Sequence, residues 1–290
     1  MSVRPVLSGI CILLCLAPAE AQGQCSDAGA CTISRHAEAD ETSHSQTLAV
    51  RYSYGSSGSP DQVKYHSVHA EATLRPFSES RLILILPFSR LTGPLGTSSG
   101  LGDIIAIWEQ EILRWGDREN SLQVQAGMRL ATGNANAKPG LPMTYQPGLG
   151  SNDVILGASC RLSHWTAGAA YQLAGARNDN SLIRLKRGDH VIAWASHEFS
   201  WHKTAFSPGV TIIKQVQKSS ALQTAGSPDA FTPVPGSAQL QVNLAVRVLH
   251  EVSSSLGTEL FAAIPLRPRD VNVDGLKRSV VLTLAILVTF

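Results

Sequence analysis

The feature that most constrains the fold of this chain is a strict two-residue alternation of apolar and polar side chains. It is clearest between residues 122 and 130, where one set of side chains is apolar and the other polar or small: Leu122, Val124, Ala126, Met128 and Leu130 against Gln123, Gln125, Gly127 and Arg129. Side chains of a β-strand point alternately to the two faces of a sheet. The same alternation returns around residues 48–54, 154–162 and 240–248. We therefore expect an all-β protein.

The connections between the predicted strands suggest a specific architecture. Strands placed wherever the pattern extends over about nine or more residues are twelve in number: 46–54, 65–75, 80–90, 102–114, 120–132, 152–163, 165–175, 189–200, 203–216, 238–250, 253–264 and 279–290. The connections after odd-numbered strands are long and rich in Gly, Pro, Ser and Asn, whereas those after even-numbered strands are short. Outer-membrane barrels combine tight periplasmic turns, long external loops and an even strand number. We expect a closed antiparallel transmembrane β-barrel over residues 45–290, with both termini periplasmic.

The end of the chain supports this expectation. An apolar stripe of period two runs through the last predicted strand and finishes on the terminal Phe290. It resembles the last-strand signal by which the insertion machinery of bacterial outer membranes recognises its barrels. That machinery and membrane lipid are therefore expected partners. Two stretches depart from the pattern: residues 82–86 are apolar on both faces, and the second face of residues 281–289 is less polar than a water-filled lumen would prefer.

The first 21 residues have the features of a secretory signal peptide. Arg4 gives a positive start, residues 6–17 are apolar, and Ala19 and Ala21 occupy the two positions that signal peptidase reads. We expect cleavage after Ala21, which leaves a periplasmic N-terminal segment over residues 22–44. After this segment no apolar run approaches the roughly 18 residues that a membrane-spanning helix needs.

Three cysteines remain in the mature chain. Cys25 and Cys31 are close enough in sequence to close a small loop in an oxidising compartment, and we expect them to form a disulfide. Cys160 is expected to be free on the lipid-facing wall beside Leu156 and Leu162.

The charged residues lie on the face opposite the apolar stripes, so we expect them to point into the lumen: Arg51, Glu71, Arg75, Glu109, Glu111, Arg129, Arg161, Arg247 and Glu259. Arginine facing lipid at mid-bilayer would cost about 2–4 kcal/mol. The two signs are nearly balanced, which disfavours a strongly ion-selective pore. A packed interior in which these groups merely pair is the alternative. The whole chain has 24 Lys and Arg against 22 Asp and Glu, which excludes nucleic-acid binding by charge.

Three short motifs carry a resemblance to a known family. They are Gly100-Leu101-Gly102-Asp103 at a strand start, Arg129-Leu130-Ala131-Thr132-Gly133 at a strand end, and Gly148-Leu149-Gly150-Ser151-Asn152-Asp153 before the next strand. In this order the sequence resembles the outer-membrane transporters named for the meta-pathway of phenol degradation, although Ala131 replaces a usual proline. The glycines permit close approach or left-handed turns, and the aspartates can cap turns. The resemblance implies uptake of small hydrophobic or aromatic compounds.

Catalysis and metal binding find little support in the sequence. Ser163-His164 and Ser196-His197 are the only candidates for a barrel lipid hydrolase, but adjacent strand residues point to opposite faces. His36, His44, His66 and His69 lack the spacing of a zinc site, and we expect no cofactor. The expected function is passive passage of a small-molecule solute across the outer membrane of a Gram-negative bacterium. A structural or surface-interaction barrel without transport is the alternative.

Overall fold

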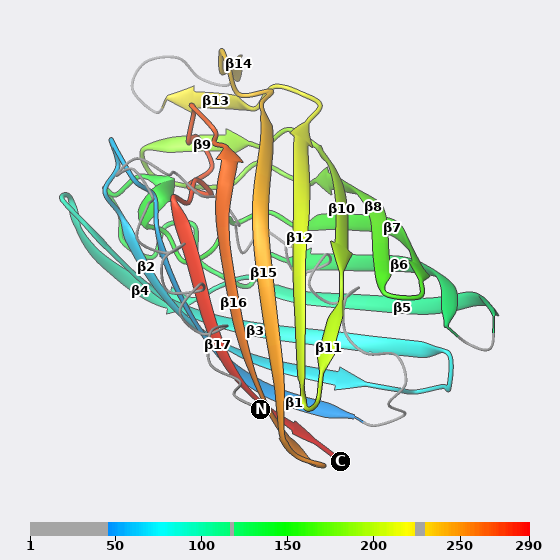
Figure 1. The fold of residues 1–290 in the computed structure, drawn as a ribbon. Coiled ribbons are helices and arrows are strands. Elements are labelled where there is room, and N and C mark those ends of the chain that lie inside the picture. Colours follow the sequence, from blue (N-terminus) through cyan, green and yellow to red (C-terminus); the bar gives the residue numbers. More distant parts are fainter. Residues whose placement is uncertain (1–45, 117–118, 224–229) are drawn as a thin grey trace.

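A computed structural model describes residues 46–116, 119–223 and 230–290, and its twelve long strands form one closed antiparallel barrel (Figure 1). In order around the wall they are β1 (Thr47–Ser56), β2 (Lys64–Leu74), β3 (Ser80–Gly93), β5 (Ile104–Trp115), β6 (Asn120–Leu130), β7 (Asp153–Leu162), β8 (Trp165–Ala174), β10 (His190–His197), β12 (Thr204–Gln215), β15 (Leu240–Ser253), β16 (Leu256–Arg267) and β17 (Val280–Thr289). β17 pairs with β1 and closes the wall. The predicted all-β barrel of about 12 strands is confirmed.

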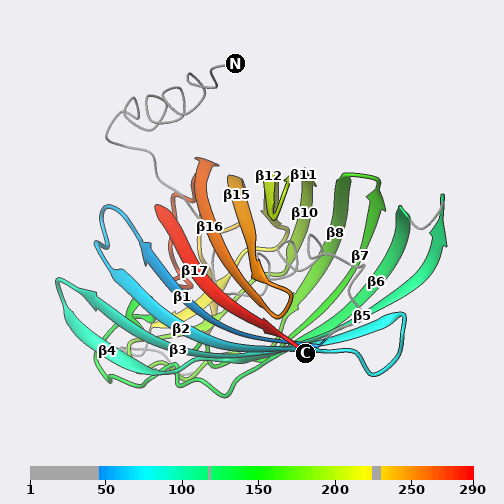
Figure 2. The same ribbon diagram turned by 60° about the horizontal axis from the view of Figure 1, so that its bottom comes forward.

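The strands cross the barrel at a steep tilt. In Figures 1 and 2 the near wall, formed by β12 and β15 to β17, runs across the far wall formed by β1 to β8, as closure of a small barrel requires. The short connections gather at one end, which we call the turn end, and the long ones at the other, the loop end. The chain finishes at the turn end, where Gln46 and Phe290 exchange two backbone hydrogen bonds of 3.0 and 3.1 Å.

Five further strands lie outside this twelve-strand order. β4 (Gly96–Leu101) pairs with β3, and β11 (Phe199–Trp201) pairs with β12. A separate small sheet at the loop end contains β9 (Ile183–Lys186), β13 (Ser220–Gln223) and β14 (Thr232–Pro233). Except for β11, these strands fall in segments expected to be loops, because runs of two to six residues are too short to show a clear period. The described residues contain no helix long and apolar enough to span a membrane.

The two faces of the wall differ sharply. Along β6, Val124 and Met128 are exposed on the outer face, whereas Gln125 and Arg129 are buried on the inner face. The same outward exposure of large apolar side chains continues around the barrel, for example at Leu48, Leu84, Leu156, Leu260 and Ile286. The barrel is therefore apolar outside and filled with side chains inside.

Candidate functional site: the barrel interior

A chain of buried ion pairs crosses the interior toward the turn end. Arg51 of β1 donates to Glu71 of β2 at 2.9 Å and to Glu259 of β16 at 2.5 Å, and Arg247 of β15 donates to Glu259 at 3.0 Å. All four side chains are at most 7% exposed. Two positive and two negative groups meet here, so this chain of residues has no net charge.

A second neutral pair lies farther round the wall. Arg81 of β3 pairs with Glu109 of β5 at 2.6 Å, and Gln125 of β6 donates to Glu109 at 3.2 Å. Arg81 was not among the residues expected to face the lumen from sequence, because it stands at the start of a strand that is apolar on both faces. Its carboxylate partner lies directly opposite in the strand register.

Three of the expected lumen residues are only half-buried and lie close to the turn end. Glu111 accepts a hydrogen bond from Arg114 at 2.7 Å. Arg75 and Glu111 line a small cavity of about 10 Å³, and Arg161 lines a similar one with Ser163 and His164. These three residues therefore belong to the rim of the barrel, whereas the other six are buried within it.

An apolar layer separates this charged region from the loop end. It is formed by inward side chains of β3, β5, β7, β8, β10, β12 and β16: Ile83, Ile85, Ile105, Ile107, Ile155, Ala170, Ile192, Trp194, Ile213, Phe261 and Ala263. Their exposures range from 0 to 8%, so side chains fill the barrel at this height. The two departures from alternation now have a physical reason: Ile83 and Ile85 belong to this layer, and Val281 packs against it.

A second group of charges lies at the loop end above the apolar layer. Asp153, at the start of β7, forms an ion pair with Arg129 at 2.6 Å and accepts hydrogen bonds from Arg187 at 2.6 Å and from Gln172 at 2.5 Å. Asp103 lies 3.6 Å from Arg129 and completes a set of two arginines and two aspartates. This group is also neutral overall, and none of its side chains is more than 4% exposed.

The three motifs on which the family resemblance rests meet around Asp103. The Asp103 carboxylate accepts the backbone N–H of Gly133 at 3.1 Å and of Leu149 at 2.9 Å. A Cβ at Gly133 would lie 2.7 Å from backbone atoms of both Gly102 and Gly148. The glycines are therefore needed because three chain segments cross in contact. The sequence suggested that Asp103 would cap its own turn, but its carboxylate instead accepts hydrogen bonds from two other segments of the chain.

This crossing anchors the connection 131–152 inside the mouth of the barrel. Leu141 and Tyr145 pack against Tyr65 and Leu91, which are inward residues of β2 and β3. The Tyr145 hydroxyl also accepts the backbone N–H of Leu95 at 3.1 Å. Burial raises the pKa of the Asp103 carboxyl above its usual value, while Arg129 and the two backbone amides oppose that rise.

A second connection, residues 268–279, covers the mouth from the other side. Arg269 pairs with Asp274 at 3.1 Å and donates to Gln241 at 3.0 Å, and the Arg278 guanidinium lies 3.3 Å from the centre of the Tyr65 ring. Burial disfavours the charged form of Asp274, but nearby cations, above all Arg269, outweigh it and hold its pKa below the usual value. A cavity of about 50 Å³ remains between this connection, residues 131–152 and the wall.

The Ser and His candidates for catalysis do not form a nucleophile and base pair. Ser196 is buried on the inner face, whereas the next residue, His197, packs against two aromatic rings, with its ring centroid 4.6 Å from that of Trp165 and 4.3 Å from that of Phe199. The ring centroids of His164 and His197 are 6.1 Å apart. Among the described residues, no group of three or more His, Cys, Asp or Glu side chains is arranged to hold a metal ion.

The predicted disulfide remains untested, whereas the prediction of a free, outward-facing Cys160 is confirmed. Cys25 and Cys31, like the whole segment 1–45, lie outside the described residues. Cys160 is a free thiol, half-buried at an outward position of β7 between the exposed Leu156 and Leu162.

Comparison with known proteins supports the fold. No protein-family profile matches the sequence, and no curated protein matches it. The COG4313 outer membrane channel from Pseudomonas putida F1 has a similar structure, with a TM-score of 0.64 and 16% identity over 85% of this chain and 95% of that one. The translocator domain of the autotransporter NalP from Neisseria meningitidis is also similar, with a TM-score of 0.51 and 8% identity over 90% of this chain and 93% of that one. At these identities the likeness shows the barrel fold alone, and the resemblance to the phenol meta-pathway transporters stays a hypothesis.

Proposed function

We propose that this barrel is an outer-membrane channel for the passive passage of small, largely uncharged, hydrophobic or aromatic solutes. Its placement in a membrane is supported by the outer face, where side chains such as Leu156 and Ile286 are more than half exposed. Left in water, so much contiguous apolar surface would drive association. In lipid the same side chains are shielded from water, and the closed wall leaves no unpaired strand edge.

The observation that carries the proposed solute class is the apolar layer inside the barrel. A purely structural barrel can be filled by paired polar groups, and this one has such groups at both ends. The layer around Ile107, Ile192 and Phe261 is filled in this structure, and once its side chains shift it presents apolar contacts to a hydrophobic solute. At about 25 cal/mol per Å², burial of 150 Å² of apolar surface would stabilise a small aromatic molecule by roughly 4 kcal/mol relative to water. An ion would have to give up its hydration there.

The ion pairs on the two sides of the apolar layer support the same solute class. Six buried arginines of the described residues have an anionic partner within 4 Å: Arg51, Arg81, Arg129, Arg187, Arg247 and Arg269. Lys277 and Arg278, buried in the connection over the mouth, donate instead to backbone carbonyls. A selective ion pore concentrates one sign of charge, whereas cations and anions are paired in the groups around both Arg51 and Arg129. The interior therefore discriminates by polarity and size.

Passage requires the mouth to open, because side chains fill the interior in this structure. The element best suited to move is the connection 131–152, which takes part in none of the pairings that close the wall. It is held by the polar contacts of Asp103, by hydrogen bonds with Asn180 and Ser181, and by two apolar clusters. We propose that its displacement, together with side-chain shifts in the apolar layer, opens the path. If the connection never moves, the structural barrel is the better interpretation.

The proposal is tested by altering the apolar layer and measuring solute selectivity. The double variant Ile107→Thr and Ile192→Thr makes the layer more polar while leaving the wall pairings intact. Proteoliposomes would be loaded with a small neutral aromatic solute or with an aromatic carboxylate of the same size. We expect the ratio of neutral to anionic flux to fall several-fold in the variant, because its layer favours the neutral solute less.

The matched control is Leu130→Val, a small change on the outer face of β6, which should leave the ratio unchanged. Arg129→Ala and Glu109→Ala, which alter the buried charged groups, should change the rate more than this control. An unchanged ratio in the Thr variant, with the barrel still migrating as a heat-modifiable band, would contradict a role for the apolar layer in selection.

A further inference from the structure

The exposed charge of the barrel is distributed unequally between its two ends. In the part of the chain that the structure describes, the loop end exposes two acids, Asp179 and Asp270, and many cations: Lys64, Arg90, Lys138, Arg177, Arg184, Lys186, Lys214, Lys218 and Arg267. The turn end exposes the acids Glu79, Glu119 and Glu251 and the cation Lys203. The loop end therefore presents a strongly positive surface, and the turn end a weakly negative one.

Four of these cations belong to strands of the barrel wall and point outward, toward the surrounding lipid of the proposed membrane. Lys64 and Arg90 belong to β2 and β3, and Lys214 and Arg267 to β12 and β16. The last two flank β15, with Lys214 opposite Leu240 and Arg267 opposite Val242. Two strand spacings and a two-residue offset put their Cα atoms about 12 Å apart.

An irregularity in the sheet turns Arg267 to the outside. The register between β15 and β16 shifts so that Asn243 faces Pro265 and Val242 faces Arg267. The extra residue, Leu266, is 61% exposed. A β-bulge of this kind changes which face the following side chain occupies, and it places Arg267 on the same outward face as Val242. Without the bulge, Arg267 would point into the barrel.

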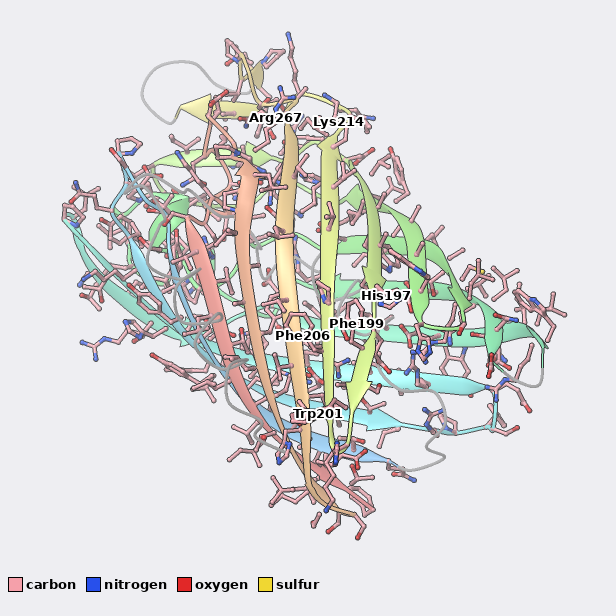
Figure 3. The ribbon with its side chains drawn as sticks, in the orientation of Figure 1. His197, Phe199, Trp201, Phe206, Lys214 and Arg267 are labelled. Atoms are coloured by element: carbon pink, nitrogen blue, oxygen red, sulfur yellow. The ribbon has the colours of Figure 1, made fainter. Side chains whose placement is uncertain are left out.

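The depth of these cations matches a membrane interface. Figure 3 shows Phe199, Trp201 and Phe206 toward the turn end of this wall and Lys214 and Arg267 toward its loop end. From Phe206 to Lys214 is eight residues of β12, about 26 Å along the strand and about 20 Å along the barrel axis at a tilt near 40°. Exposed aromatic residues typically mark one edge of the apolar band, which is about 25 Å tall. Lys214 and Arg267 thus lie near its opposite edge.

We propose that the outward cations of the loop end, Lys214 and Arg267 foremost, bind the phosphate groups of a phosphorylated glycolipid in the outer leaflet. This inference rests on the outer-membrane placement proposed above, with the loops outside. Ammonium and guanidinium groups form strong charge-assisted hydrogen bonds with phosphate oxygens. Within the described residues neither cation is in an ion pair, and Lys214 makes one hydrogen bond, to the carbonyl of Ala238 at 3.2 Å. Both remain available to a ligand.

Binding of purified barrel to lipid A tests the inference independently of transport. The protein in detergent would be titrated with fluorescent bisphosphorylated lipid A, with its dephosphorylated form, and with phosphatidylglycerol. One cation at an anionic membrane surface contributes roughly fivefold in affinity, so the variant K214Q/R267Q should bind lipid A about 30-fold more weakly. Lys203→Gln, which removes the exposed cation at the turn end of the same wall, is the matched control and should bind as the parent does.

Three results would overturn the inference: unchanged affinity in K214Q/R267Q, an equal loss in the Lys203→Gln control, or equal affinity for dephosphorylated lipid A. Affinity for phosphatidylglycerol equal to that for lipid A would also overturn it, by replacing the glycolipid with any anionic lipid. Heat-modifiable mobility checks that each variant is folded. Flux in liposomes is measured separately, and K214Q/R267Q should conduct as the parent does. An absence of flux from every protein would refute the channel and leave the binding result standing.

Discussion

Replacing Gly133 with alanine should release the connection 131–152 from the mouth of the barrel. The added Cβ would lie 2.7 Å from the carbonyl carbon of Gly102, 2.7 Å from the Cα of Gly148 and 2.9 Å from the backbone nitrogen of Asp103. Real Cβ atoms essentially never approach backbone so closely, and backbone on three sides cannot move aside as a flexible side chain would. The segments must therefore separate.

The size of the effect follows from the crowding. Overpacking of this kind typically costs about 1–3 kcal/mol, and separation also breaks the hydrogen bonds from Gly133 and Leu149 to Asp103. A bias of 1–3 kcal/mol shifts an equilibrium between closed and open states by about 5- to 150-fold. We expect solute flux to rise within that range. Hydrogen exchange over residues 141–149 should quicken, while the wall strands keep their protection.

The control is Gly257→Ala, at a position where the added Cβ would meet no atom nearer than 3.7 Å. It should change neither flux nor exchange. If Gly133→Ala behaves like Gly257→Ala, with equal flux and equal protection of residues 141–149, the glycine crossing does not hold the mouth closed, and the reasoning is wrong.

Three further predictions concern stability and the cysteines. Arg51→Ala removes the cation that Glu71 and Glu259 share and should cost about 3–5 kcal/mol, seen as a lower temperature at which the folded band is lost; a shift no larger than that of an exposed arginine variant would contradict it. Asp274 has a lowered pKa, so its pair with Arg269 should hold at neutral pH and be lost only as pH falls below about 4, the usual carboxyl value, and through the lowered one. Protection of residues 268–279 from hydrogen exchange, taken relative to the intrinsic amide rate at each pH, should then fall in acid, and Asp274→Asn should remove this pH dependence; dependence that persists in the variant would assign it to another group. Cys25 and Cys31 should appear as a disulfide-linked peptide without reductant, and Cys25→Ser should leave the barrel folded, because a small loop contributes at the low end of about 0–5 kcal/mol; two free thiols or an unfolded variant would refute this.

The wall of the barrel was predictable because each strand carries its own evidence. The alternation from Leu122 to Leu130 gives both the strand and its outward face without any knowledge of the neighbours. Strand ends were less predictable. The strand expected over 102–114 begins at Ile104. Gly102 and Asp103 lie outside any strand, between β4 and β5, which pair with different parts of β3. This interruption of the strand depends on the connection 131–152, which contacts Gly102 and Asp103.

The interior was less predictable because its contacts join residues far apart in the chain. Arg51 and Glu259 are 208 residues apart, and nothing near either residue indicates the other. Arg187 and Arg269, which pair with Asp153 and Asp274, lie in long connections where no periodicity assigns a side chain to a face. One signal was present and could have been used: the doubly apolar stretch from Leu82 to Leu86 marks the inner apolar layer.

The most direct test of the central claim is passage itself. Purified protein would be reconstituted in liposomes, its folded state verified by heat-modifiable mobility, and the entry of a small neutral aromatic solute compared with that of an aromatic anion of equal size. A channel with a neutral interior and an apolar inner layer should admit the neutral solute faster than empty liposomes do, and faster than it admits the anion. Neutral flux equal to that of empty liposomes, from a barrel shown to be folded, would contradict the proposed function.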